Sequence, residues 1–144
     1  MKVSSIVADK GTFVATISPT TSVSDAIGML TKHRVGCLVV SENGSQISGM
    51  FSERDVIRAL GSGPGVLNQP VSDFMTSDVR VVDPDLHLDE LMKMMTEFRI
   101  RHLPVVDESG SLTAIVSIGD VVKHRLDELE SERAALVDYV TRGG

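Results

Sequence analysis

Apolar residues recur at helical spacing in two stretches of the chain that lie 65 residues apart. The two stripes consist of Val23, Ala26, Ile27 and Leu30 and of Leu88, Leu91, Met92 and Met95. Residues spaced i, i+3, i+4 and i+7 share one face of a helix. Each stretch therefore predicts an amphipathic helix whose apolar face, rich in flexible methionine in the second copy, packs into a core.

Short β-type segments flank each predicted helix. One strand is expected before it (13–17 and 79–82), and two follow it (35–41 and 46–51, then 100–107 and 112–116). Turn residues separate the two later strands in both copies, at Asn43-Gly44 and Ser109-Gly110. A second helix is expected to begin at Ser52 and at Ser117. The pattern predicts the order β-α-β-β-α twice, each time after a short helical turn.

The two stretches are copies of one another. Residues 16–60 align with 81–125 without a gap, and 9 of the 45 positions are identical. Residues 3–7 echo 71–75 at a shift of 68, so the first copy carries three extra residues around Lys10. We expect an α/β (α+β) fold in which two repeats, 1–62 and 66–126, pack with pseudo-twofold symmetry. The glycine-rich stretch 61–65 is expected to be a flexible joint.

The tail, 127–144, predicts an amphipathic helix. Its apolar residues continue a 4,3 spacing from Val122 through Leu126, Leu129, Leu136 and Val140, and Arg133 interrupts it. Two interpretations remain open: the helix lies back on its own module, or it forms a dimer contact.

Composition narrows the functional classes. The 144 residues are 42% hydrophobic and 24% charged, as in an ordinary globular protein, and the net charge is −6. No basic cluster favours nucleic acid, and no apolar run is long enough for a membrane span. The single cysteine, Cys37, cannot form an internal disulfide, so a reducing, cytoplasmic setting is expected.

A doubled motif joins the third strand to the second helix of each copy. Ser52 precedes Asp55 by three residues, and Ser117 precedes Asp120 in the same way. Such a pair caps a helix, and this alone can explain it. The alternative is a ligand site, because a helix N-terminus suits phosphate and a carboxylate can accept both hydrogens of a ribose diol. Gly49 on the preceding strand permits close approach, and Arg54 adds a charge for phosphate.

The β-α-β-β-α repeat, the proline before each first helix and the doubled Gly-h-x-Ser-x-x-Asp junction resemble tandem CBS domains, the regulatory pair called a Bateman module. The resemblance covers roughly residues 1–126. The stretches 51–55 and 99–106 are similar to a stand-alone subgroup with no catalytic domain attached. No catalytic arrangement of residues is found, so the chain is expected not to be an enzyme.

The resemblance implies adenine-nucleotide binding in clefts between the repeats, with AMP foremost and ATP, ADP or NAD as alternatives. The first set of implied site residues is Thr16, Ile17, Val35, Gly36, Cys37, Ser52, Arg54 and Asp55. The second set is Val81, Val82, Arg99, Ile100, Arg101, His102, Pro104, Ser117 and Asp120. The second copy has Ala114 where the motif has glycine, and Gly119 where the first has Arg54. Two unequal sites are therefore expected.

Other residues carry weaker indications. The histidines and Cys37 lack the spacing of a metal site, and none is expected. Lys10 is either a surface-loop residue or a phosphate contact. Arg34 and Arg99 sit at matched helix ends and either complement the helix dipole or bind an anion.

The resemblance also implies a homodimer of two modules in a flat disc. The alternative function is a ligand-free interaction protein that regulates a partner enzyme or transporter directly.

Overall fold

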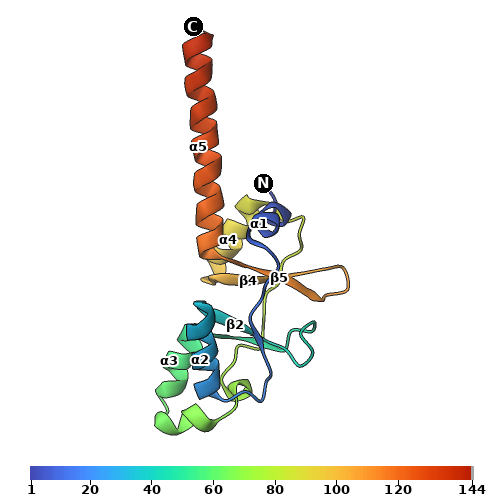
Figure 1. Ribbon diagram of the computed structural model, residues 1–144, viewed down its shortest axis with the longest axis vertical. Helices are drawn as coiled ribbons and strands as arrows, with labels where there is room; N and C mark the ends of the chain where they lie inside the picture. The colour runs from blue at the N-terminus through green and yellow to red at the C-terminus, as the bar shows by residue number, and fades with distance from the viewer. Residues whose placement is uncertain (144) are drawn as a thin grey trace.

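The structure is a computed structural model that describes residues 1–143. It has two lobes, one above the other in Figure 1. The lower lobe contains β1 (Thr16–Ile17), α2 (Val23–His33), β2 (Cys37–Val40), β3 (Gly49–Ser52) and α3 (Glu53–Leu60). Its sheet has the order β1-β2-β3, with β1 parallel to β2 and β3 antiparallel to it. The helices α2 and α3 lie beside this sheet, which matches the predicted element order.

The upper lobe repeats this plan. It contains α4 (Leu88–Phe98), the antiparallel strands β4 (His102–Val106) and β5 (Leu112–Ser117), and α5 (Ile118–Arg142). The predicted first strand, 79–82, is reduced to a single parallel bridge between Val82 and Val105. In the lower lobe the corresponding strand is also short, two residues instead of the five expected at 13–17.

The hydrogen bonds follow the 65-residue shift of the sequence. The Ser41 N–H donates to the Ile17 carbonyl at 2.9 Å, and the Val106 N–H donates to the Val82 carbonyl at the same distance. Both first helices end on an arginine in the left-handed conformation, Arg34 at φ 54° and Arg99 at φ 52°. The predicted fold of two repeats related by pseudo-twofold symmetry is therefore confirmed.

The leading helices are exchanged between the lobes. Helix α1 (Val3–Lys10) buries Val3 and Ile6 in the core of the upper lobe, beside Leu91 and Val116. The equivalent short 3₁₀ helix η2 (Val71–Asp73) buries its first residue in the core of the lower lobe. Each core is thus completed by a segment from the start of the other repeat, which couples the two lobes.

The predicted joint at 61–65 is ordered. Its last two residues open the 3₁₀ helix η1 (Pro64–Asn68), which packs on α2 and α3. Val66 is buried in this contact. Burial of an apolar side chain immediately after the glycines fixes the segment, which the local composition did not indicate.

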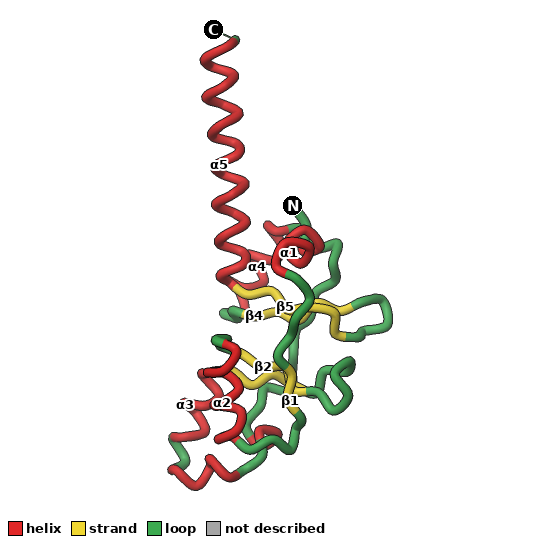
Figure 2. Tube along the Cα trace, viewed as in Figure 1, coloured by secondary structure: helices red, strands yellow, loops and turns green. Residues whose placement is uncertain are grey.

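The C-terminal helix is not a separate element. Helix α5 begins at Ile118 and continues unbroken to Arg142. Its later turns project away from both lobes (Figures 1 and 2). Every side chain from residue 131 to 143 is exposed. The interpretation that the tail lies back on its own module is therefore wrong, because the tail continues α5 as one straight helix away from the lobes. The last residue of the predicted tail, Gly144, lies outside the described residues.

Candidate functional site

The doubled motif forms a capping box at both helix starts. At α3, the Asp55 backbone N–H donates to Ser52 Oγ at 3.4 Å, and the Ser52 N–H donates to Asp55 Oδ2 at 2.9 Å. At α5, Ser117 and Asp120 make the same two bonds at 3.2 and 2.8 Å. Each pair satisfies donors that a helix start leaves open. The capping interpretation of the motif is therefore correct for one carboxylate oxygen of each aspartate.

The second oxygen of Asp55 has looser partners. The Thr76 hydroxyl donates to Asp55 Oδ1 at 3.4 Å, and Arg58 Nη1 lies 3.2 Å from the same atom. The Asp55 side chain is only 3% exposed, whereas Arg58 is largely in solvent. A buried carboxylate needs compensation. Asp55 thus holds one oxygen in a rigid cap and the other in contacts that are long for charge-assisted hydrogen bonds.

A cleft of about 270 Å³ opens above Asp55 between the two repeats. The first repeat contributes Gly36, Cys37, Met50, Ser52, Glu53, Arg54, Asp55 and Arg58. The segment that follows η2 adds Thr76, and the second repeat contributes Arg99, Ile100, Arg101 and His102. Four arginines therefore line this cleft in a chain whose net charge is −6. Such a concentration of guanidinium groups suits a phosphate or carboxylate.

A smaller hollow of about 210 Å³ adjoins the cleft. The two share Met50, Thr76, Ile100 and His102, and the hollow continues along 78–80 to Phe98. Here Arg80 stacks on the Phe98 ring, 3.5 Å from its centre. The combined site therefore has four arginines at one end, and at the other it has Met50, Val79, Phe98 and Ile100 beside the charged Asp78 and Arg80.

Gly49 is needed by the chain itself. A side-chain Cβ at this position would meet Met75 Sδ at 2.7 Å and the Thr76 carbonyl oxygen at 2.8 Å. Residues 75–76 therefore occupy the space that a side chain at position 49 would need. Thr76 pairs there with Met50 through two backbone hydrogen bonds of 2.9 Å. The counterpart Ala114 is buried in the upper core, where a methyl group fits.

Burial shifts the pKa values of two side chains, Cys37 and His102, that occupy equivalent positions of the two repeats in the cleft. Burial, and next the charge of Asp55, raise the pKa of the Cys37 thiol to about 12. Cys37 is therefore a protonated, buried thiol, which agrees with its interpretation as a small strand residue. Its counterpart His102 has a lowered pKa, chiefly because burial disfavours the imidazolium and the charge of Lys10 adds to this.

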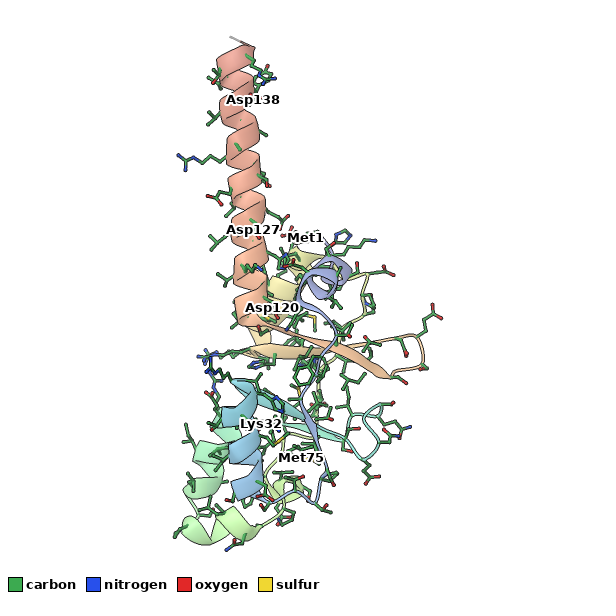
Figure 3. All side chains as sticks on the ribbon, in the orientation of Figure 1. Met1, Lys32, Met75, Asp120, Asp127 and Asp138 are labelled. Atoms are coloured by element: carbon green, nitrogen blue, oxygen red, sulfur yellow. The ribbon has the colours of Figure 1, made fainter. Side chains whose placement is uncertain are left out.

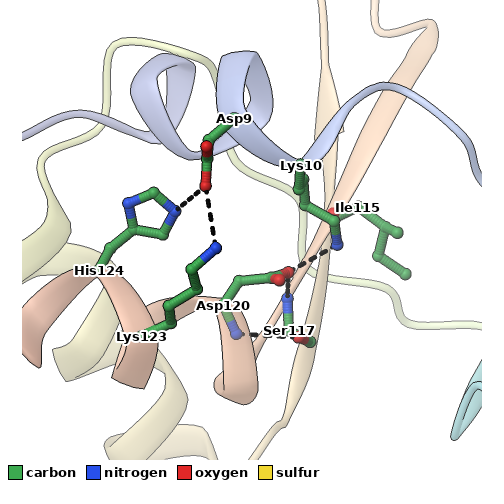
Figure 4. A network of polar contacts seen from close by, with 7 residues as sticks. All are labelled: Asp9, Lys10, Ile115, Ser117, Asp120, Lys123 and His124. Atoms are coloured by element: carbon green, nitrogen blue, oxygen red, sulfur yellow. Dashed lines mark hydrogen bonds and ion pairs between the residues drawn. The ribbon is translucent and has the colours of Figure 1, made fainter. Parts of the chain in front are cut away.

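The carboxylate of Asp120 is held by the protein itself (Figure 4). Lys10 Nζ lies 2.6 Å from Asp120 Oδ2 and also donates to the Ile115 carbonyl at 2.9 Å. The two side chains are 27% and 21% exposed. Burial acts to raise the pKa of Asp120, but the hydrogen bonds from Lys10 and Ser117 outweigh it, and the pKa lies below its ordinary value. Lys10 is thus neither a loop residue nor free to bind an anion in this structure.

A second set of contacts fixes the end of α1 that carries Lys10. Asp9 Oδ2 lies 3.2 Å from Lys123 Nζ and 3.4 Å from His124 Nε2, both on α5 (Figure 4). His124 is buried, whereas Lys123 and Asp9 are more than half exposed. These contacts hold the last turn of α1 against the first turns of α5.

The predicted site residues separate into two groups. The Asp55 cleft brings together Gly36, Cys37, Ser52, Arg54, Asp55, Arg99, Ile100, Arg101 and His102. The structure places the remaining ones elsewhere: Thr16 and Ile17 in β1, Val35 beside the lower core, Val81 on the surface, Val82 and Pro104 buried in the upper lobe, and Ser117 and Asp120 in the second capping box. Arg34 lies at a separate surface hollow, so only Arg99 of the matched pair faces the cleft.

Sequence reasoning missed four lining residues: Met50, Glu53, Arg58 and Thr76. Arg58 follows Asp55 by three residues on α3, and this spacing places the two side chains together. Thr76 directly follows the 71–75 echo of the N-terminal segment. Its place beside Asp55 depends on the exchange of leading segments, for which local sequence carries no signal.

Membrane-spanning helices and metal-binding clusters are both absent among residues 1–143. No helix there is both long and apolar enough to cross a membrane. Across the same residues, no group of three or more histidine, cysteine or acidic side chains is arranged to hold a metal ion.

The CBS domain family matches this chain twice, over residues 6–62 and 71–127. The CBS domain-containing protein YhcV of Bacillus subtilis is 32% identical over 128 residues, which are 88% of this chain and 89% of that protein. The crystal structure of the CBS-domain containing protein ATU1752 from Agrobacterium tumefaciens is 41% identical with a TM-score of 0.82, covering 86% of this chain and 92% of that one.

A further solved structure, that of CBSX2 in complex with AMP, is 29% identical with a TM-score of 0.70. The match covers 79% of this chain and 88% of that chain. Two family matches in tandem account for the duplicated sequence, the paired capping boxes and the cleft between the lobes. This chain belongs to the CBS domain family, and its two lobes are a tandem pair of CBS domains.

Proposed function

We propose that this protein senses an adenine nucleotide, with AMP as the first ligand to test, in the cleft above Asp55. Stand-alone CBS pairs are regulatory modules and not catalysts. The observation that carries the proposal is the pairing of a buried carboxylate with four arginines from both repeats. A ribose offers hydroxyl donors to the carboxylate, and a phosphate suits the guanidinium groups. The adjoining hollow offers Met50, Phe98 and Ile100 to a base.

The AMP complex of a relative supports this choice. CBSX2 was solved with AMP, and it shares the fold and 29% of its sequence with this chain. ADP, ATP and NAD also carry adenosine and are the alternatives. The cleft of about 270 Å³ is near the lower limit of small-molecule sites, about 300–1,000 Å³, which favours the mononucleotide.

Binding would exchange partners on Asp55. Oδ2 remains in the helix cap with Ser52, so only Oδ1 is available. Ribose hydroxyls at Oδ1 would replace Arg58, whose contact there is an exposed one of 3.2 Å. Arg58 would then turn towards the phosphate together with Arg54 and Arg99. The ribose is neutral, so hydrogen bonds from its hydroxyls and from Thr76 would compensate the buried Asp55 carboxylate in place of the ion pair.

Occupancy would be transmitted through the relative placement of the two lobes. The ligand touches Arg54 and Asp55 of one repeat and Arg99 to His102 of the other. A ligand that bridges both repeats favours the closed arrangement, by no more than its difference in affinity for the two arrangements. An effector protein would respond to that change.

The Asp120 side is the weaker site in this proposal. A ribose at Asp120 would meet a carboxylate whose capping oxygen, Oδ2, also pairs with Lys10 at 2.6 Å, and Lys10 is held in addition by the Ile115 carbonyl. We expect the two sites to be unequal because this lysine is partly buried, whereas the cation beside Asp55 is a largely exposed arginine at 3.2 Å.

Thermal unfolding with and without nucleotide tests the proposal. A ligand present at about 100 times its Kd stabilises the protein by about 2.7 kcal/mol. We expect this shift with AMP, its loss in Asp55→Ala and its retention in Asp120→Ala. The two variants are matched because each removes one capping-box carboxylate, and each is compared with its own unliganded form. If no adenine nucleotide shifts the wild-type protein, the ligand-free interaction protein becomes the better hypothesis.

The modules are also proposed to form a homodimer. Ile57 on α3 and Val122 on α5 occupy equivalent positions of the repeat and are 72% and 50% exposed. Leu60 extends this apolar face on α3 and Ile118 extends it on α5, although their own counterparts, Arg125 and Glu53, are charged. Two copies meeting through these faces would form a disc. Light scattering at micromolar concentration should give twice the mass of the chain, and Ile57→Glu should lower it.

A further inference from the structure

The outer part of α5 stands without a partner. The helix has 25 residues, so it extends about 37 Å at 1.5 Å per residue. Its first turns contact α1, α4 and β5, but all side chains from 131 to 143 are exposed. Figure 3 shows the side chains around Asp138 projecting on all sides of the helix, well beyond the lobes. The outer stretch of the helix, 131–142, is short enough to be marginally stable in water without tertiary contacts, so a partner that covers it would stabilise it.

Five of the eight large apolar residues that are exposed on α5 lie on one stripe, and Ile118, Val137 and Tyr139 lie beside it. Its members are Val122, Leu126, Leu129, Leu136 and Val140, and their exposed fractions run from 44% at Leu129 to 71% at Val140. The steps between them are 4, 3, 7 and 4 residues, with Arg133 in the remaining slot. A mean spacing of 3.5 residues is that of the a and d positions of a coiled coil. Val122, Leu129 and Leu136 then take d, and Leu126, Arg133 and Val140 take a.

The charges beside the stripe favour one partner and one orientation. Arg125 takes position g and Glu130 takes position e, five residues later. In a parallel pair of identical helices, g of one chain faces e of the other at this separation, so Arg125 meets Glu130 of the second copy twice. The antiparallel pairing that overlaps the same stripe instead places Glu130 against Glu130 and Glu132 against Glu132. Like charges at these positions oppose association.

Arg133, the one charged residue among the a and d positions of the stripe, is also compatible with a parallel pair. Two Arg133 side chains would face each other across the axis, where a long side chain can carry its charge to the rim. Glu132 of the second copy flanks that position and supplies the opposite charge. Within the described part of the chain, Glu130, Glu132 and Arg133 form no ion pair. All three are therefore available to a partner helix.

We propose that α5 pairs with α5 of a second copy of this chain as a short parallel coiled coil from Val122 to Val140. The coiled coil shares Val122 with the proposed disc interface and continues it along α5 between the same two copies. It does not depend on nucleotide binding, and it fixes the two modules at the same end of a common stalk.

A cysteine cross-link tests both the contact and its orientation. In the full chain, Arg133→Cys places two thiols face to face across a parallel pair, and mild oxidation should give a covalent dimer. Ser131→Cys is the matched control, because position f lies on the outer side of the helix. The native Cys37 is buried and should not react. Absence of the cross-link at 133, or equal cross-linking at 131, would overturn the proposal.

Two further comparisons separate this contact from the disc interface. Leu136→Glu should weaken self-association measured by light scattering across a dilution series by at least about tenfold, whereas Ala135→Glu at position c should not. If Ile57→Glu dissociates the protein and Leu136→Glu does not, the disc interface is supported and the coiled coil is wrong.

A charge reversal tests the parallel orientation. Arg125→Glu should weaken the association, and adding Glu130→Arg should restore it. Failure of the double variant to restore it would contradict the parallel orientation.

Discussion

Asp55 and Asp120 occupy equivalent positions and make the same helix cap, yet their remaining carboxylate contacts differ. Asp55 is 3% exposed and meets a hydroxyl and a largely solvent-exposed arginine at 3.2–3.4 Å. Asp120 is 21% exposed, and the same oxygen that caps its helix, Oδ2, meets a lysine at 2.6 Å. Both copies of the motif form the same helix cap. The side chains that contact each aspartate from outside its cap, Thr76 and Arg58 or Lys10, decide how readily its carboxylate can accept a ligand.

The physical origin of the difference is three residues in the first copy. In the second copy, η2 ends at Asp73 and Thr76 runs beside Met50, exchanging two backbone hydrogen bonds with it. In the first copy, α1 continues to Lys10, and the Lys10 ammonium donates to the Ile115 carbonyl instead. Ile115 is the counterpart of Met50. One lysine side chain therefore replaces both the backbone contact and the hydroxyl of Thr76.

The largest effect on stability is expected when the glycine of the motif, Gly49, is replaced by alanine. Gly49→Ala should destabilise the protein by roughly 1–3 kcal/mol, because its Cβ would meet Met75 and the Thr76 backbone. Gly119→Ala is the matched control, because its Cβ would lie 3.6 Å from Ser117 Oγ, an ordinary contact. Urea unfolding measures both. A fully stable Gly49→Ala would show that the 75–76 segment does not need this close approach.

The next effect is expected at Lys10. Lys10→Met removes a short, partly buried ion pair and should cost about 1–2 kcal/mol at pH 7. The pKa of Asp120 lies below the ordinary value of an aspartate, so the stabilisation is present above that ordinary pKa and is lost as pH falls through the lowered pKa of the folded protein. The difference between wild type and Lys10→Met in urea unfolding should therefore shrink towards pH 3.

Lys123→Met is the control for that experiment, since its pair with Asp9 is more than half exposed. It should change stability by less than about 1 kcal/mol. Equal losses in the two variants would mean that the Lys10 contact is an ordinary surface pair and does not distinguish the Asp120 side.

A smaller, pH-dependent effect is expected at His102, which faces Lys10, Glu53, Asp120 and Arg101. Its pKa is lowered in the folded state, so the stability it contributes is present above pH 6.5 and is lost as pH falls below that value. Between pH 7.5 and 5.5, the urea midpoint of His102→Gln should therefore fall less than that of wild type. His87→Gln on the exposed start of α4 is the control and should behave as wild type does.

The smallest effect concerns Cys37, where no change in stability is involved. A pKa of about 12 in place of 9.0 leaves roughly a thousandfold less thiolate at pH 8. Reaction with a disulfide reagent should be correspondingly slow in the folded protein and fast in urea. Rapid labelling of the folded protein would show that the floor of the Asp55 cleft opens to solvent.

Much of the fold follows from local patterning. The two apolar stripes became α2 and α4, and the motif serines became the N-caps of α3 and α5. The cleft is predicted less completely. The contacts of Asp55 with Ser52 and Arg58 lie within one helical turn, so sequence spacing carries them. Thr76 reaches Asp55 across 21 residues, and Thr16 and Val82 lie in or beside the sheets instead of in the cleft.

The sequence by itself determined the duplication, the helix caps and the family, because these depend on residue types at short, fixed spacing. Only the tertiary structure decided that the leading segments are exchanged between the lobes and that Lys10 is the partner of Asp120. It also decided that α5 leaves the body of the protein. The physical reason is that each of these depends on which apolar surface a segment finds to bury, and that surface is made by residues far away in the chain.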